Sequence, residues 1–92
     1  MEYEWDQSKA IANFKKHGVS FNEAKTVFED PLAVIFDDEM HSIDEYREII
    51  IGHSQQNRLL LIAFIERSGR IRIISARLAT RTERNDYEQY AL

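Results

Sequence analysis

A run of seven apolar residues, from Leu59 to Ile65, constrains the fold of this chain more than any other feature. The run is far too short to cross a membrane, and it lacks the alternation of polar and apolar residues that marks a half-exposed strand. Such a run is typical of a central strand that is buried on both faces. The chain has 92 residues, so we expect residues 1–92 to form one domain around this strand.

Capping patterns predict three helices. Asp6 is a candidate N-cap for a helix over residues 7–17, and Gly18 stands where that helix should end. Ser20 and Thr80 each precede a glutamate by three positions. This capping-box pattern opens a second helix, running to about residue 29, and a C-terminal helix. Helical spacing gives the first two helices one apolar side each, formed by Ala10, Ile11 and Phe14 and by Phe21, Ala24, Val27 and Phe28.

Four further segments have the character of strands. They cover residues 2–5, 32–36, 46–51 and 70–75, which alternate or are rich in β-branched and aromatic residues. The element order is therefore β-α-α-β-β-β-β-α. Helices grouped before an antiparallel meander indicate an α+β fold with a mainly antiparallel sheet. We expect the two N-terminal helices to pack on one face of the sheet and the other face to carry the functional site.

The charged residues are unevenly distributed along the chain, although the net charge is −4. Residues 1–48 hold five Lys or Arg against twelve Asp or Glu. Residues 49–84 hold seven arginines against only Glu66 and Glu83, and every basic residue after Lys25 is an arginine. The forked donors of arginine suit phosphate contacts. A local arginine field on an acidic body indicates a binding site for phosphate groups.

Several classes of protein lack support in this sequence. There is no cysteine, so disulfides and thiolate metal sites are excluded, as expected in a reducing cytosol. The start of the sequence has no signal-peptide pattern and no apolar run has membrane length, so we expect a cytoplasmic protein without a membrane contact. No Gly-rich phosphate loop, Ser/His/Asp pattern or zinc spacing occurs, and the acidic loop around His41 fits no defined metal motif. We therefore expect neither a cofactor nor a metal.

Several short motifs together resemble the BrnT family of toxins. They occur in order along most of the chain, and each is weak by itself. They are Trp5-Asp6 with Lys9-Ala10 and Asn13; Lys16 to Phe21 with Glu23-Ala24; Phe28 to Pro31; Glu45 to Arg47; Ile49 to Gly52; Ile71 to Arg77; Ala79-Thr80; Glu83-Arg84; and Tyr87-Glu88.

The resemblance implies a RelE-like fold and an endoribonuclease toxin that cleaves mRNA, on the ribosome or free, and so inhibits translation. It also implies a BrnA-like antitoxin with a ribbon-helix-helix module, bound to the toxin as a heterotetramer. Operator DNA would be contacted only through that antitoxin.

Metal-free RNA cleavage needs groups that stabilise the charged phosphorane and groups that move protons. Arg77, Arg81 and Arg84 are spaced to line one side of the junction between the last strand and the last helix, where the helix N-terminus also favours anions. We expect them to clamp the phosphate. The alternative is a solvated helix face on which Arg84 pairs with Glu88.

Two side chains are candidates for proton transfer. His17 can act as acid or base near neutral pH, although a histidine before glycine is often only a C-cap group. Tyr87 could stack on a base or donate a proton, or simply dock its helix on the sheet.

Three further cations are candidate RNA contacts. Lys16 lies at the end of the first helix, and Arg70 and Arg72 share one face of the last strand. The same two arginines could equally form the wet side of that strand.

Two other functions compete with the endoribonuclease. A non-catalytic interaction module would use the arginine surface to dock an acidic antitoxin or regulator, which is consistent with the lack of an obvious acid/base pair. An autonomous DNA- or RNA-binding regulator is a third possibility, but the acidic net charge and the lack of a recognition helix weigh against it.

Overall fold

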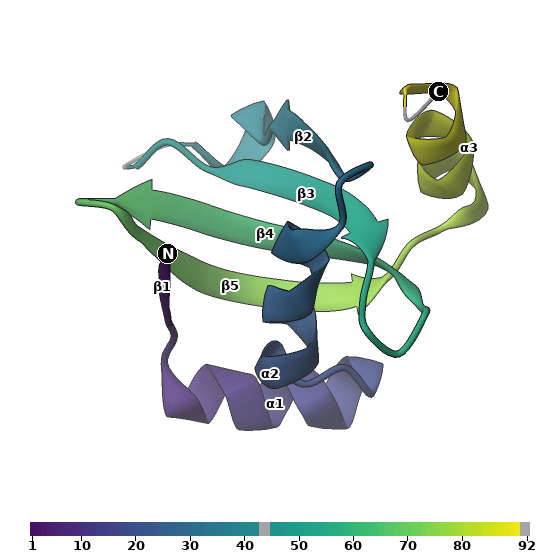
Figure 1. The fold of residues 1–92 in the computed structure, drawn as a ribbon. Helices are drawn as coiled ribbons and strands as arrows, with labels where there is room; N and C mark the ends of the chain where they lie inside the picture. Colours follow the sequence, from purple (N-terminus) through teal and green to yellow (C-terminus); the bar gives the residue numbers. More distant parts are fainter. Residues whose placement is uncertain (43–44, 91–92) are drawn as a thin grey trace.

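The computed structural model describes residues 1–42 and 45–90, which form the predicted α+β fold (Figure 1). The elements follow in the expected order: β1 (Glu2–Glu4), α1 (Gln7–His17), α2 (Phe21–Ala24), the 3-10 turn η1 (Lys25–Glu29), β2 (Val34–Asp37), the 3-10 turn η2 (Glu39–His41), β3 (Glu48–His53), β4 (Leu59–Arg67), β5 (Arg70–Leu78) and α3 (Arg81–Tyr90). None of the helices in the described ranges is long and apolar enough to cross a membrane.

The five strands form one sheet in the order β1-β5-β4-β3-β2. Only β1 runs parallel to its neighbour, and the other pairs are antiparallel. The central strand is β4, and its residues from Leu59 to Ile65 are all buried. This confirms the prediction that the uninterrupted apolar run is a strand covered on both faces.

Strand bounds differ from the predicted ones where side chains form turns. The carboxylate of Asp30 accepts the amide of Leu32 (2.9 Å), so the chain turns there and β2 starts at Val34 instead of residue 32. The last strand continues past residue 75, because Leu78 still pairs with Leu60 on β4. Arg77 therefore lies within β5, not in a loop ahead of the last helix.

Both N-terminal helices begin at the predicted capping residues, and α1 also ends at its predicted cap. Asp6 accepts the amide of Lys9 at the start of α1, and Gly18 ends it with a positive φ of 69°. Ser20 accepts the amide of Glu23 (3.0 Å) and opens α2. The second helix is α-helical only to Ala24 and continues as the 3-10 turn η1, so its prediction as one α-helix to about residue 29 was wrong in its second half.

The main core lies between the sheet and α1, α2 and η1. The predicted apolar side of the second helix enters it, with Phe21, Ala24 and Val27 almost fully buried and Phe28 packed against them. On α1 the prediction holds for Ala10, which packs against the core, and was wrong for Ile11 and Phe14, which are about half exposed.

The residue that α1 buries deeply is Asn13. Its side chain donates to the carbonyls of Val19 (3.0 Å) and Ala76 (2.8 Å) and accepts the amide of Ala76 (3.1 Å). A polar side chain with all these bonds satisfied can take a buried position that an apolar one would otherwise hold. It fixes α1 to β5.

A second, smaller cluster lies on the other face of the sheet under α3. Tyr87 packs there against Ile51, Leu59 and Leu61. In Figure 1, α3 stands at the end of the sheet that is far from α1. α3 therefore covers only part of that face.

The loop between β3 and β4 is held by a buried carboxylate. The side chain of Glu23 is only 2% exposed and accepts Arg58 Nε (2.9 Å), Arg58 Nη2 and the hydroxyl of Ser54 (2.7 Å). Arg58 also donates to the carbonyl of Gly18 (3.1 Å). The hydrogen bonds from Arg58 lower the pKa of Glu23, although burial opposes them. This network ties the loop to α2 and to the end of α1.

Replacing Gly52 by alanine should destabilise the fold, because β3 passes very close to the chain between η1 and β2 at this point. A Cβ on residue 52 would lie 2.9 Å from the Cβ of Ala33 and 3.1 Å from Val27 Cγ1, and neither neighbour has a flexible end that can move away. Overpacking of this kind costs about 1–3 kcal/mol. Urea unfolding followed by circular dichroism should show a lower midpoint with an unchanged slope, whereas an unchanged midpoint would contradict the close approach.

Candidate active site on the open face of the sheet

A cavity of about 470 Å³ occupies the uncovered face of the sheet, between η2 and α3. Its floor is apolar and is formed by Ile49, Leu61 and Ala63, with Ser75 beside them. Charged side chains form its rim. They are Asp38 and His41 from the η2 region, Arg47 ahead of β3, Arg77 from β5 and Glu83 from α3.

Arg77 and Glu83 form a two-pronged ion pair at the α3 side of the cavity. Arg77 Nη1 and Nη2 lie 2.7 and 2.8 Å from the two carboxylate oxygens of Glu83. These hydrogen bonds lower the pKa of Glu83 and raise that of Arg77, although burial opposes both shifts. Glu83 also completes the predicted capping box, because it accepts the amide of Thr80 (2.9 Å). Arg77 thus holds the start of α3 against the sheet.

Arg47 contributes a second guanidinium to the rim. Its backbone makes three hydrogen bonds: its amide donates to Ser42 Oγ (2.9 Å), and its carbonyl accepts the Asp38 amide (2.9 Å) and the Ser42 hydroxyl (3.4 Å). Within residues 1–42 and 45–90, its guanidinium takes part in no ion pair. Of the two rim arginines, it is the one that has no carboxylate partner in the described part of the chain.

His41 is held by Asp38 on the opposite rim. The imidazole Nδ1 lies 3.0 and 3.2 Å from the two carboxylate oxygens of Asp38. An ionised carboxylate only accepts hydrogen bonds, so Nδ1 carries the hydrogen and the neutral ring leaves Nε2 free to take a proton. The His41 side chain is 63% exposed, so substrate can reach it. This geometry is that of an oriented general base.

Taken together, the cavity combines an oriented imidazole with two guanidinium groups around an apolar floor. Guanidinium groups bind phosphate oxygens, and an imidazole moves protons near neutral pH. In the described ranges, no group of three histidine, aspartate or glutamate side chains is placed to hold a metal ion. The arrangement suits proton-transfer chemistry on a phosphodiester.

The structure does not bring the three arginines of the expected clamp together. Arg77 lines the cavity, but neither Arg81 nor Arg84 does, and both are exposed on α3. Successive helix residues are about 100° apart. Arg81 therefore projects from nearly the opposite side of α3 to Glu83, which faces Arg77.

The two arginines at the start of β5 are already paired within the chain. Arg72 Nη1 lies 3.1 Å from a carboxylate oxygen of Glu4. Arg70 lies 3.6 Å from carboxylate oxygens of both Glu2 and Glu4. The parallel pairing of β1 with β5 places these acids directly beside the arginines. Neither arginine lines the cavity, and their charge is largely neutralised.

Lys16 and His17 lie at the C-terminal end of α1. Lys16 is exposed and His17 is half-buried. Neither residue lines the cavity, since α1 covers the other face of the sheet. The structure therefore separates them from Arg77.

Tyr87 turns its hydroxyl inward, away from the cavity. The hydroxyl donates to Asp30 Oδ2 (2.9 Å) and lies 3.2 Å from His53 Nδ1. Burial, and then the bond to Asp30, raise the pKa of Tyr87 to about 12. Burial also raises the pKa of Asp30, but the hydrogen bonds from the His53 and Leu32 amides and from Tyr87 outweigh it and leave that pKa lowered. This cluster joins α3 to the segment ahead of β2.

Sequence reasoning missed Arg47, His41 and Asp38 as members of one site. Arg47 lay within a predicted strand, and His41 was considered only as a metal ligand. The available signal was the spacing of Asp38 and His41, three positions apart in a polar loop. That spacing allows one side chain to orient the other when the loop forms a 3-10 turn.

The comparisons with known proteins agree with this fold. The family model described as "Ribonuclease toxin, BrnT, of type II toxin-antitoxin system" matches residues 5–83. The crystal structure of the Brucella abortus ribonuclease toxin BrnT matches with a TM-score of 0.68 and 24% identity, over 88% of this chain and 99% of that one. None of the curated proteins matches the sequence. Because the family model covers most of the chain, the chain belongs to the BrnT family of ribonuclease toxins of type II toxin–antitoxin systems.

Proposed function

We propose that this chain is an endoribonuclease toxin that cleaves RNA in the cavity on the open sheet face, without a metal ion. A BrnA-like antitoxin with a ribbon-helix-helix module neutralises it, in a heterotetramer that contacts operator DNA through the antitoxin. The observation that carries the proposal is the placement of an Asp38-oriented imidazole and two arginines around one cavity.

In the proposed reaction, the 2′-hydroxyl of RNA attacks the adjacent phosphorus. His41 Nε2 accepts the hydroxyl proton while the new oxygen–phosphorus bond forms. The bond to the 5′ oxygen then breaks, and that oxygen takes up a proton from water, while His41 returns the 2′-hydroxyl proton to solvent. The products are a 2′,3′-cyclic phosphate and a free 5′-hydroxyl.

The two arginines stabilise the charge that builds up on the phosphorane. Arg47, which forms no ion pair among the described residues, meets the phosphate. Arg77 spends three N–H groups on Glu83 and the carbonyl of Leu78, so its remaining N–H groups can bind a phosphate oxygen. Arg81 and Arg84 are exposed on α3 and lie outside the cavity, so they are not part of the proposed phosphate site.

The competing reading, a non-catalytic module that docks an acidic partner on an arginine surface, gains little from the structure. Arg70, Arg72 and Arg77 already have carboxylate partners from this chain. A docking protein would have to compete with those carboxylates, and in the described ranges only Arg47, Arg81 and Arg84 among the arginines have no ion pair.

Replacing Arg77 by alanine should slow RNA cleavage about ten- to hundredfold, since a charge-assisted hydrogen bond contributes about 1.5–3 kcal/mol. The measurement is cleavage of a fluorescent RNA by the purified chain in the presence of EDTA. Arg81→Ala serves as the matched control and should change the rate by less than about threefold, because Arg81 projects away from the cavity.

Two results would contradict the proposed mechanism. Cleavage that requires magnesium would exclude the metal-free reaction. Equal losses in Arg77→Ala and Arg81→Ala would place the phosphate at the start of α3 and not in the cavity.

A further inference from the structure

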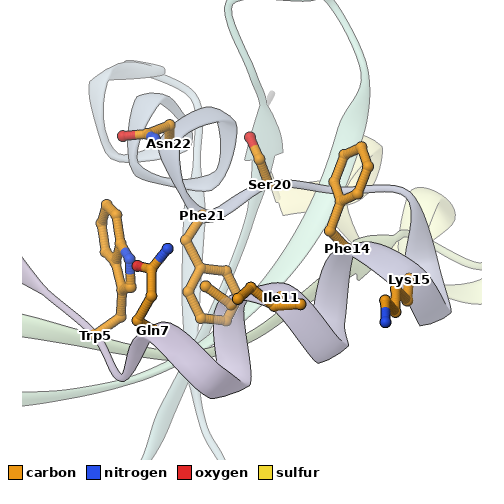
Figure 2. A pocket seen from close by; sticks show the side chains of 9 residues that line it. Trp5, Gln7, Ile11, Phe14, Lys15, Ser20, Phe21 and Asn22 are labelled. Carbon is orange, nitrogen blue, oxygen red and sulfur yellow. The ribbon is translucent and has the colours of Figure 1, made fainter.

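An apolar groove of about 360 Å³ lies on the far side of the molecule from the open sheet face, between α1 and α2. Figure 2 shows Trp5 at one end, Phe14 at the other, and Ile11 and Phe21 between them. Trp5 meets Phe21 edge to face, with ring centroids 5.8 Å apart. The groove takes no part in the proposed RNA cleavage, because none of its residues reaches the cavity.

The exposure of this groove follows from the way α1 is attached. Asn13 faces the sheet and makes the hydrogen bonds that hold the helix. The apolar residues Ile11 and Phe14 are consequently left 52% and 56% exposed. Adjacent exposed apolar side chains that line a groove are typical of a protein–protein contact.

The charge around the groove indicates the chemistry of its occupant. Gln7–His17 contains three lysines and no acidic residue. Lys15 lines the groove beside Phe14, whereas Lys9 and Lys16 add positive charge elsewhere on the helix. Within residues 1–42 and 45–90, none of these lysine side chains forms an ion pair. Asp6 caps the other end of α1, next to Trp5.

We infer that the groove anchors an acidic amphipathic segment of a partner protein, with its apolar side chains between Trp5 and Phe14 and its carboxylates over Lys15. The acidic end of the segment lies towards the C-terminal turn of α1, away from Asp6. A second copy of this chain fits poorly, because a two-fold contact through α1 would oppose lysine to lysine.

The inference rests on the proposed function for the source of the segment, which is the antitoxin. An antitoxin anchored here holds the face of the molecule opposite the cavity. Binding of the antitoxin at this groove therefore does not require the arginines that already pair with Glu2, Glu4 and Glu83.

The test uses synthetic peptides that contain no tryptophan. One is a 16-residue peptide with leucines at i, i+3 and i+7 and glutamates elsewhere, and the other carries lysines in place of the glutamates. Trp5 is the only tryptophan of the chain, so its emission reports on the groove. We expect the acidic peptide to shift the Trp5 emission and to bind at least about tenfold more tightly than the basic peptide.

Variants locate the contact. Phe14→Glu should weaken binding of the acidic peptide about thirtyfold, as expected for a residue at the centre of an interface. Leu32→Glu is the matched control, because Leu32 is also 53% exposed but lies outside the groove, and it should bind like the wild type. Equal binding of the two peptides, or equal binding by Phe14→Glu and Leu32→Glu, would overturn the inference. A 20-nucleotide single-stranded RNA that shifts Trp5 emission and loses binding in Phe14→Glu would assign the groove to RNA and overturn it too.

Failure of the proposed function is measured separately. Phe14→Glu should cleave RNA at the wild-type rate. Absence of RNA cleavage by the wild-type chain would contradict the endoribonuclease proposal but would not affect the peptide-binding result. The purified toxin–antitoxin complex should no longer respond to the acidic peptide, and a response equal to that of the free chain would place the antitoxin elsewhere.

Discussion

Replacing His41 by alanine should slow RNA cleavage by about 10²–10⁴-fold, the usual contribution of a general acid or base. His41 is the one histidine that lines the cavity within the described ranges, and Asp38 holds its ring through Nδ1, which leaves Nε2 without that partner. The fold should be unaffected, because the side chain is 63% exposed. The measurement is the single-turnover rate on a fluorescent RNA, with the unfolding midpoint as a check.

His17→Ala is the informative comparison, because His17 was the acid/base candidate that the sequence favoured. It lies at the end of α1, on the face of the sheet that the cavity does not use. The rate of this variant should stay within about twofold of the wild type. A large loss in His17→Ala, with none in His41→Ala, would move the chemistry to the end of α1 and refute the cavity. The cleavage rate of Asp38→Asn should lie between those of His17→Ala and His41→Ala, because the imidazole of His41 would remain but would lose its orientation.

Replacing Arg58 by alanine should destabilise the chain by about 3 kcal/mol. Glu23 is almost fully buried, and removing its cationic partner leaves a buried charge, which typically costs about 3–5 kcal/mol. Arg58 itself is 34% exposed, so water can partly replace it, and we expect the lower end of that range. Urea unfolding at neutral pH measures the loss.

Arg67→Ala is the matched control for this change. Arg67 also holds a glutamate with two nitrogens, at 3.0 and 2.6 Å from Glu45, but both side chains are about half exposed. Exposed pairs contribute about 0–1 kcal/mol, so this variant should be nearly as stable as the wild type. Similar losses of stability in Arg58→Ala and Arg67→Ala would show that the burial of Glu23 does not explain the effect of Arg58→Ala.

Lowering the pH should also weaken the stabilisation that the Glu23–Arg58 pair gives to the fold. The pKa of Glu23 in the folded chain is lowered below its ordinary 4.5, chiefly by the hydrogen bonds from Arg58. The stability that depends on this lowering is fully present above pH 4.5 and is lost as the pH falls through the folded pKa. The gap in stability between wild type and Arg58→Ala should therefore narrow in acid.

The parts of the fold that local chemistry determines could be predicted from the sequence. The uninterrupted apolar run forms β4 because only a central strand buries both faces. Asp6, Ser20 and Thr80 cap their helices as expected, since a cap depends on residues within one turn. The family resemblance, carried by motifs spread along the chain, is confirmed by the family model.

The details that depend on distant contacts could not be predicted. Asn13 holds the buried position on α1 because its amide bonds to Ala76, which is 63 positions away. For the same reason Ile11 and Phe14 face outward, which no periodicity argument could reveal. The cavity draws Arg47 and His41 from a loop and Arg77 from β5, and only the sheet brings them together. The predicted clamp of Arg77, Arg81 and Arg84 required the last strand to end before Arg77. In the structure β5 continues to Leu78, so Arg77 lies in the strand.

The bond between Arg77 and Glu83 also bears on how RNA affinity varies with ionic strength. A free arginine that meets a phosphate releases a counterion from the nucleic acid, and each such contact steepens the loss of affinity with added salt. Glu83 already offsets the charge of Arg77, so a phosphate that binds the remaining N–H groups of Arg77 meets an ion pair with little net charge. We therefore expect the RNA affinity of this chain to fall only slowly as salt is added, and Arg47 to account for most of that fall.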